Sequence, residues 1–232
     1  SPASMARNKE GFLETIKTIV IAVALALVFR SFFYEPFHIP SGSMKGNLLI
    51  GDYIFVDKMA YGYSRYSFPF SPDLFKGRKF GLHRPERGDV VVFRKPSQPD
   101  IDFIKRLIGL PGDRVQVISG IVYINGRPLP RREVKSFSEF DQITRTQLTI
   151  PQYEETLPQG KKYTVLEQTQ FGQMDNTIIY EVPPGHCFMM GDNRDNSTDS
   201  RYIHEVGFVP EENLVGKAVL IAFSVDEDWM PR

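Results

Sequence analysis

The chain has 232 residues, and its 28 Lys and Arg balance its 28 Asp and Glu, so the formal net charge at pH 7 is zero. A balanced charge argues against nucleic acid as a partner, since nucleic-acid binding calls for a basic surface. The single cysteine cannot form an internal disulfide, and the 4 histidines show no metal-ligand spacing with it, so we expect no metal and no other cofactor. The 17 prolines and 18 glycines, among many Val, Ile, Phe and Tyr residues, favour a mostly β protein with frequent turns.

An apolar segment from Gly11 to Phe33 follows the polar residues 1–10 and carries charges only near its ends. As a helix it would be about 34 Å long at ~1.5 Å per residue, enough to cross a ~30 Å hydrocarbon layer. A buried core helix and a cleaved signal peptide are alternatives, but no small-x-small cleavage site follows Phe33. The aromatic residues at its end are typical of a membrane interface. We therefore expect a transmembrane anchor over residues 11–34.

Basic residues flank this anchor unevenly, with Arg7, Lys9 and Lys17 on the N-terminal side and Arg30 on the C-terminal side. Loops rich in Lys and Arg stay in the cytoplasm. We therefore expect residues 1–10 in the cytoplasm and everything after Tyr34 on the outer side of the membrane.

Short apolar runs after the anchor predict antiparallel strands separated by turns. They cover residues 48–56, 90–94, 101–108, 115–118, 121–124, 186–190 and 215–223, with a turn at 96–99. Residues 128–181 are more polar, with isolated strands predicted at 162–166 and 177–182. The expected fold is an N-terminal transmembrane helix followed by an antiparallel β-sheet domain, made of residues 35–127 and 182–232 and interrupted by a smaller inserted β subdomain over 128–181.

Residues 60–82 mix aromatic and basic side chains without periodicity and predict a long loop. Such a loop beside a membrane anchor can lie on the lipid headgroups. A loop that simply packs on the domain has the same composition. Both interpretations stay open.

A Ser-Gly-Ser sequence at 41–43 follows the anchor closely, and its glycine permits backbone torsions that help to expose a nucleophile. A serine nucleophile needs a base within hydrogen-bond reach. No histidine has a suitable context, because His38 is on the same predicted strand as Ser43, while His83 and His204 lie in irregular polar segments. A Ser-His pair is therefore disfavoured.

Lysine is the better candidate for the base. Alternation along residues 101–108 places Lys105 between Phe103 and Leu107 on one face of a strand. Desolvation there disfavours the ammonium form and lowers the pKa, so that a neutral amine can accept a serine proton. An edge-strand lysine that reaches water is the alternative interpretation, and Lys45 is an alternative base.

Residues 191–201 are dense in Asp and Asn, which invites comparison with a calcium-binding loop. The EF-hand pattern fails, because with Asp195 as its first position Ser200 stands where glycine is needed and Val206 where the bidentate glutamate belongs. The segment is either a turn-rich surface loop or a loop packed against the site. In the second case we expect Ser197 to bond Lys105 and Asp199 to pair with Arg201.

Four segments together resemble the sequence boxes of bacterial type I signal peptidases, the membrane-bound Ser/Lys proteases that remove signal peptides. They are FHIPSGSM (37–44), DFIKRLIGLPGD (102–113), GDNRDNSTDSR (191–201) and GFVPEENLVGKA (207–218). The resemblance covers nearly all of the chain. It implies Ser43 as the nucleophile and Lys105 as the general base.

The same resemblance implies roles for further residues. The oxyanion hole would be formed by the Ser41 hydroxyl and the Ser43 backbone N–H, Ser197 would orient Lys105, and Asp199 and Arg201 would form a structural ion pair. A small substrate pocket for Ala-x-Ala sequences would be lined by Phe37, Ile39, Leu48 and Ile104.

The expected function is a serine endopeptidase that removes signal peptides from exported preproteins at the outer face of a bacterial cytoplasmic membrane. Its partners would be signal peptides and the lipid bilayer. Gly46-Asn47 stands where the family usually has Pro-Thr. The alternative is therefore a membrane-anchored β-rich binding or scaffold protein with an impaired protease site.

Overall fold

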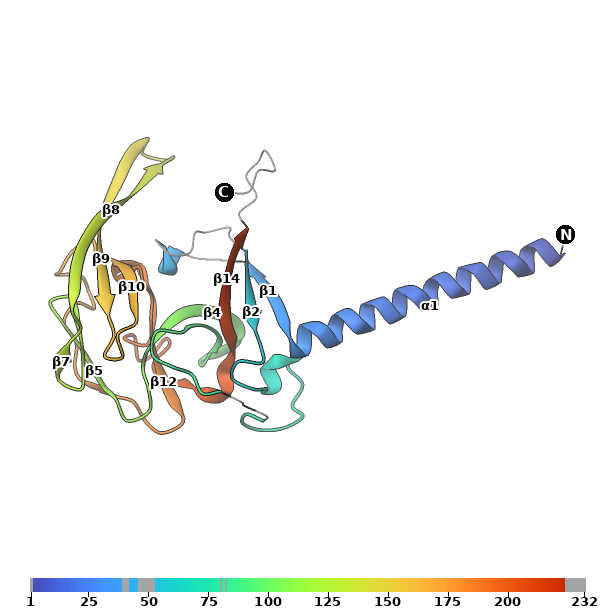
Figure 1. Ribbon diagram of the computed structural model, residues 1–232, viewed down its shortest axis with the longest axis horizontal. Helices are drawn as coiled ribbons and strands as arrows, with labels where there is room; N and C mark the ends of the chain where they lie inside the picture. Colours follow the sequence, from blue (N-terminus) through green and yellow to red (C-terminus); the bar gives the residue numbers. More distant parts are fainter. Residues whose placement is uncertain (1, 39–41, 46–52, 80, 82, 224–232) are drawn as a thin grey trace.

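One long helix projects from a body built of antiparallel strands in this computed structural model (Figure 1). The structure describes residues 2–38, 42–45, 53–79, 81 and 83–223. The strands of the body form three sheets. The mostly β fold with an N-terminal apolar helix that the sequence predicts is confirmed.

Helix α1 (Pro2–Phe32) projects from the body, and Ser31 near its C-terminal end is its buried residue. Its most apolar 18-residue window has a mean hydropathy of 2.2 and none of that window is buried. The interpretation as a buried core helix is therefore wrong. A helix of this length and composition is able to cross a membrane. It begins at Pro2, before the apolar segment, so the polar residues before Gly11 continue the same helix.

The largest sheet has the strand order β1-β2-β14-β3-β4-β12-β13. Its strands are β1 (Tyr34–His38), β2 (Tyr53–Asp57), β14 (Leu214–Phe223), β3 (Val90–Lys95), β4 (Gln98–Gly109), β12 (His186–Met190) and β13 (Val209–Pro210). The turn expected at 96–99 is shorter, because Lys95 already pairs with Gln98 in a β3–β4 hairpin. Strand β4 therefore lies in the interior of the sheet, between β3 and β12.

Two smaller sheets complete the body. One has the order β11-β5-β6-β7, formed by β11 (Tyr180–Glu181), β5 (Arg114–Ile118), β6 (Ile121–Ile124) and β7 (Arg127–Pro128). The other has the order β10-β9-β8, formed by β10 (Lys162–Leu166), β9 (Thr146–Thr156) and β8 (Arg131–Asp141). The hairpin of β8 and β9 rises from the body (Figure 1).

The strand expected over 177–182 is reduced to Tyr180–Glu181, although Thr177 N–H still donates to Val117 O at 2.9 Å. Four 3₁₀ turns interrupt the described loops: η1 (Gly42–Met44), η2 (Arg65–Ser67), η3 (Arg194–Asn196) and η4 (Glu211–Asn213).

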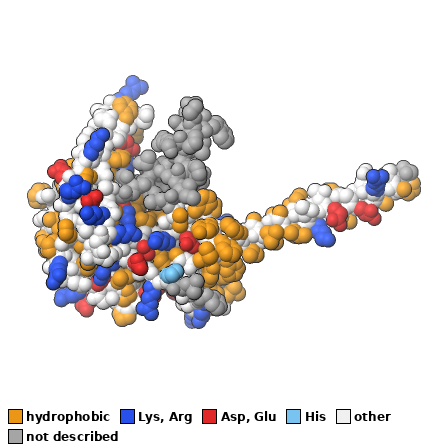
Figure 2. Space-filling model, in the orientation of Figure 1, with side chains coloured by type: hydrophobic (Ala, Val, Ile, Leu, Met, Phe, Trp, Pro, Cys, Tyr) orange, Lys and Arg blue, Asp and Glu red, His pale blue; other side chains and the backbone are white. Residues whose placement is uncertain are grey.

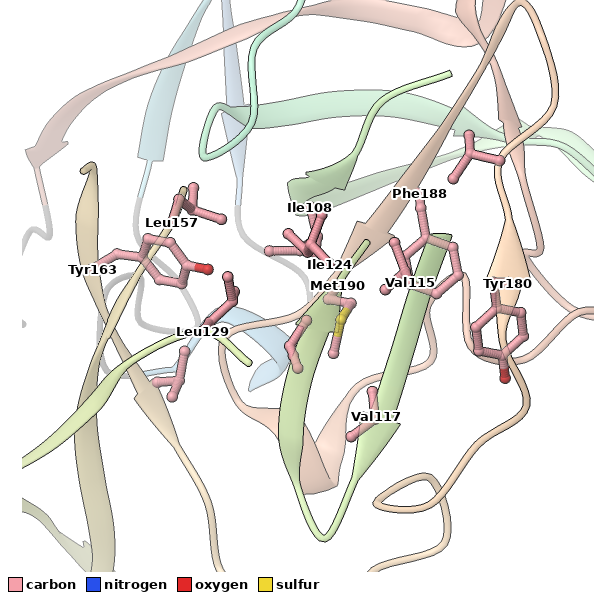
Figure 3. Close-up of a cluster of buried hydrophobic side chains, with 13 residues drawn as sticks. Ile108, Val115, Val117, Ile124, Leu129, Leu157, Tyr163, Tyr180, Phe188 and Met190 are labelled. Atoms are coloured by element: carbon pink, nitrogen blue, oxygen red, sulfur yellow. The ribbon is translucent and has the colours of Figure 1, made fainter. Parts of the chain in front are cut away.

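Buried side chains from both sides of position 128 form one hydrophobic cluster (Figure 3). Ile108 and Val115 precede the segment 128–181 and Phe188 follows it, whereas Leu157 and Tyr163 belong to this segment, which the sequence predicts to be an insert. Because the two parts share a core, the segment 128–181 supports the sheet that carries β4. The boundaries of the inserted subdomain stay a prediction.

Candidate active site

The turn η1 holds Ser43 in a sheltered position. Lys45 N–H donates to Gly42 O at 3.0 Å and closes the turn. Met44 is fully buried and packs in a cluster with Ile54 and Val56 of β2, so the turn is anchored on the large sheet. Ser43 is only 5% exposed. The predicted oxyanion donor Ser41 lies outside the described residues.

Lys105 is buried in the middle of β4, opposite Val91 of β3, and is 4% exposed. The predicted alternation is confirmed, because Phe103 and Leu107 pack in one cluster whereas Ile104 and Ile108 pack in two others. The interpretation as an edge-strand lysine is wrong, since β4 has a neighbour on each side.

Burial gives Lys105 an unusual protonation equilibrium. Loss of hydration lowers its pKa from 10.5 to about 8, although the negative charge of Asp199 opposes the shift. The ring of Phe103 lies 5.4 Å from the ammonium nitrogen. A lysine with this pKa is partly neutral near physiological pH, so it can accept a proton.

Ser43 and Lys105 line the same cleft, which has a volume of about 470 Å³. Residues 101–105 of β4 and residues 195–198 line the cleft together with Gly42, Ser43 and Tyr202. The cleft thus brings together four of the predicted site residues, since Ile104 and Ser197 also line it.

The loop 191–201 packs directly on the nucleophile turn. Asn193 N–H donates to Ser43 O at 2.9 Å, and Asn193 Nδ2 donates to Gly42 O at 3.0 Å. Two hydrogen bonds from one residue fix the backbone on both sides of the Ser43 amide nitrogen. The interpretation as a free surface loop is therefore wrong.

The Asp199 carboxylate holds this loop together by accepting hydrogen bonds from three of its residues. It accepts hydrogen bonds from Ser197 Oγ at 2.8 Å, from Gly191 N–H at 3.0 Å and from Arg201 Nε at 2.8 Å. Burial alone would raise the pKa of Asp199, but the Arg201 guanidinium and these hydrogen bonds hold it below its ordinary value. The carboxylate is therefore charged at neutral pH and close enough to influence Lys105. The expected bond from Ser197 to Lys105 stays a prediction.

A small apolar pocket lies beside the cleft. Phe37 and Ile104, two of the four predicted pocket residues, line it, and its volume is about 40 Å³. Asp102, Phe103 and Ile104 line both the pocket and the cleft. A pocket of this size has room for about three water-sized groups, so it accepts only a small side chain. Ile39 and Leu48 lie outside the described residues.

Lys45, the alternative base, does not line the described cleft. Its ammonium instead forms an ion pair with Glu139 of β8. The arrangement favours Lys105.

Sequence reasoning missed two buried ion pairs that support the site. Arg106, next to Lys105, binds Asp192 through Nε at 2.9 Å and Nη2 at 2.7 Å. Arg194 binds Glu155 of β9 at 2.9 Å. Both link the loop 191–201 to strands far away in the sequence. The sequence feature that could have indicated the first pair is Arg106 itself, a charged residue on the opposite face of the strand from Lys105. Its partner could not be identified, because it lies 86 residues away in the sequence.

Comparisons with known proteins agree on one family. A family model described as signal peptidase, peptidase S26, matches residues 12–223. A signal peptidase I of Rickettsia typhi is 45% identical over 221 residues, which cover 91% of this chain and 80% of that protein. One of Rickettsia akari is 44% identical over 219 residues, with 89% and 78% covered.

Among solved structures, a signal peptidase I from Enterococcus faecalis V583 is 27% identical, with a TM-score of 0.34, and covers 59% of this chain and 98% of that chain. At that TM-score the likeness carries no inference about the arrangement of the strands.

Proposed function

Because the chain belongs to the signal peptidase family, peptidase S26, we propose that it cleaves preproteins with a catalytic pair formed by Ser43 and Lys105. It is a serine protease of the signal peptidase I type, anchored in a bacterial membrane by its N-terminal helix, and its substrates carry signal peptides. The observation that supports the pair is a buried lysine with a pKa of about 8 that shares one cleft with a buried serine.

In the first half of the proposed reaction, neutral Lys105 accepts the proton of Ser43 Oγ while that oxygen attacks the scissile carbonyl carbon. The carbonyl oxygen becomes an oxyanion, which accepts hydrogen bonds from Ser43 N–H and the Ser41 hydroxyl. Such donors stabilise charge that develops only in the transition state. The Lys105 ammonium then gives its proton to the departing amine, leaving an ester on Ser43.

In the second half, a water molecule gives a proton to neutral Lys105 as its oxygen attacks the ester carbon. The tetrahedral species collapses, and Ser43 Oγ leaves and takes the proton from Lys105. The acid product is released, and both side chains return to their starting states. No metal or other cofactor is needed for these proton transfers.

Ser197, Asp199 and Arg201 position the base in this proposal. Asp199 carries a negative charge near Lys105 and therefore favours the ammonium that forms during attack. Burial opposes the same ammonium in the resting enzyme. The two effects together place the pKa of Lys105 between that of an exposed lysine and neutrality, as a general base requires.

The small pocket supports a preference for Ala-x-Ala sequences. Phe37 and Ile104 line it, and we propose that Ile39 and Leu48 complete it. Larger side chains would meet the pocket walls before the scissile bond reached Ser43 Oγ. We also propose that residues 11–34 span the cytoplasmic membrane, and that the catalytic domain, 35–127 and 182–232 with its insert 128–181, lies on the outer side.

The catalytic pair is tested by Ser43→Ala and Lys105→Met in the full chain, with an Ala-x-Ala peptide as substrate. Because the two groups act as a unit, each variant should lose at least about a thousandfold in kcat/KM. Lys161→Met, which removes a half-exposed lysine, serves as the matched control and should keep wild-type activity. Full activity in either pair variant rejects the proposal. A wild-type protein that retains the peptide uncleaved would instead support the binding or scaffold alternative.

A further inference from the structure

Lys45 connects the nucleophile turn to the β8–β9 hairpin. Its ammonium forms an ion pair with the Glu139 carboxylate of β8, and its backbone N–H closes η1 on Gly42 O at 3.0 Å. Lys45 follows Ser43 by two residues, so their Cα atoms are at most about 7 Å apart. The ion pair therefore joins the segment 128–181 to the turn that carries the proposed nucleophile.

Glu139 lies in the part of the hairpin that extends beyond the third strand of its sheet. Strand β10 pairs with β9 as far as Gln152, whereas β8 pairs with β9 out to Asp141 and Thr146. This part rises from the body at the upper left of Figure 2, and Ile143 at its end is 94% exposed. A two-stranded ribbon is only marginally stable in water by itself. Contacts with the body therefore decide where the end of the hairpin lies.

Strand geometry directs Glu139 toward the body. Phe137, Glu139 and Asp141 lie on one face of β8, since side-chain direction in a strand repeats every two residues. Ile150 is directly opposite Phe137 in the register and is 2% exposed, so this is the face that packs inward. The backbone of β8, and not a chance side-chain rotamer, thus places the carboxylate beside the nucleophile turn.

The Lys45 charge also reaches a second carboxylate of the same face. The pKa of Asp141 lies below its ordinary value, chiefly because Ile143 N–H and Thr144 N–H donate to its carboxylate. The positive charge of Lys45 contributes to the same shift. The acidic face of the hairpin end and the nucleophile turn are therefore close enough to attract each other.

The residue after Lys45 increases the need for such a contact. A glycine such as Gly46 loses more backbone freedom on folding than any other residue type, and that loss opposes an ordered turn. Met44 holds the turn on the large sheet, and Asn193 holds it on the loop 191–201. The Lys45–Glu139 pair holds it on a third element, next to the glycine.

We propose that the Lys45–Glu139 ion pair positions Ser43 for attack, and that the β8–β9 hairpin influences catalysis through this pair. Both are positioning residues, because neither is among the described residues that line the cleft. An ion pair between partly exposed side chains shifts an equilibrium by up to about fivefold. Loss of the pair should therefore lower kcat by about two- to fivefold and leave KM nearly unchanged. The inference rests on the proposed role of Ser43 as the nucleophile.

The kinetic test compares Lys45→Met and Glu139→Gln with the exchanged pair, Lys45→Glu combined with Glu139→Lys, in the full chain with an Ala-x-Ala peptide. Each single variant should lose about two- to fivefold in kcat, and the exchanged pair should regain most of that loss. The matched control is Arg132→Met, which breaks the pair of a 71% exposed arginine with Glu154 on the same two strands and should keep the wild-type kcat. Full activity in Glu139→Gln, with the exchanged pair as inactive as Lys45→Met, would make Lys45 itself the base and overturns the inference.

Hydrogen exchange at residues 42–45 tests the positioning without relying on activity. The bond from Lys45 N–H to Gly42 O should open more often when the ion pair is absent. Glu139→Gln should therefore speed exchange in the turn by about two- to fivefold, and Arg132→Met should leave it at the wild-type rate. Equal exchange in these two variants overturns the inference. A wild-type chain that cleaves no peptide, although exchange is faster in Glu139→Gln, contradicts the proposed function alone.

Discussion

Gly191 and Ser197 lie so close together that Gly191 has no room for a side chain. A Cβ placed on Gly191 would overlap Ser197 Oγ, and it would come within 2.5 Å of Ser197 Cβ and 2.7 Å of Ser43 O. Contacts below 3 Å are not tolerated by real Cβ atoms. The absence of a Cβ at Gly191 therefore allows the loop 191–201 to rest on the nucleophile turn.

Gly191→Ala should displace Ser197 and the backbone at Ser43 while leaving most of the fold unchanged. A misplacement of about 1 Å can cost on the order of a hundredfold in rate. We expect kcat to fall by about that factor and KM to change little. The measurement is steady-state cleavage of an Ala-x-Ala peptide, with Gly11→Ala as control because nothing lies within 4 Å of a Cβ there. An unchanged kcat would show that the contact does not position the site.

Asp199 and Arg201 form a fully buried ion pair, in which the guanidinium holds the pKa of the carboxylate below its ordinary value. Asp199→Asn would leave a buried guanidinium without its counter-charge, which typically costs about 3 to 5 kcal/mol. The control is Glu154→Gln, which removes the charge of a partly exposed carboxylate that pairs with Arg132 and Lys162, and it should cost about 0 to 1 kcal/mol. Urea unfolding of the full chain in detergent measures both.

The difference in unfolding free energy between wild type and Asp199→Asn should depend on pH, because the pKa of Asp199 differs between the folded and unfolded states. Because its folded pKa lies below its ordinary value, the stabilisation is fully present above about pH 4 and is lost as pH falls through the folded value. The gap between wild type and Asp199→Asn should therefore be constant at neutral pH and close in acid. Equal stability of Asp199→Asn and Glu154→Gln at pH 7 would contradict a structural role for the pair.

Much of the site follows from local sequence. The alternation of residues 101–108 is sufficient to place Lys105 between Phe103 and Leu107, because side-chain direction in a strand repeats every two residues. The anchor likewise follows from an uninterrupted apolar segment. Both features depend only on neighbours along the chain.

Other features depend on which distant strands pair, and composition does not encode that. The bonds from Arg106 to Asp192 and from Arg194 to Glu155 join segments that meet only after the sheets have formed. The shared core of Leu157 and Phe188 is of the same kind, so the polar composition of residues 128–181 did not reveal how closely that segment supports β4. Phe70 has a φ angle of 62°, in the left-handed region, although it is not a glycine, so its backbone conformation could not be predicted from the residue type.

The pocket lined by Phe37 and Ile104 yields a prediction for specificity. Ile104→Ala removes part of a wall and should admit a larger side chain into a space of about 40 Å³. We expect kcat/KM for a peptide with Val in place of one Ala of Ala-x-Ala to rise relative to the parent peptide, by about 10- to 100-fold, since one or two methylene groups are worth roughly 1 to 3 kcal/mol. Ile143→Ala, at the distant hairpin, should leave the ratio unchanged. If the ratio of kcat/KM for the two peptides is the same in Ile104→Ala and Ile143→Ala, the pocket beside Ile104 does not bind the substrate side chain.

The dependence of kcat/KM on pH tests most directly whether Lys105 is the base for Ser43. Burial lowers the pKa of Lys105 to about 8, so the neutral amine appears as pH rises through that value. For the wild-type chain and an uncharged Ala-x-Ala peptide, kcat/KM should rise about tenfold per pH unit below pH 8 and level off above it. A rise centred near 6.5, as for a histidine, or a profile that is flat from pH 6 to 9 would contradict Lys105 as the base.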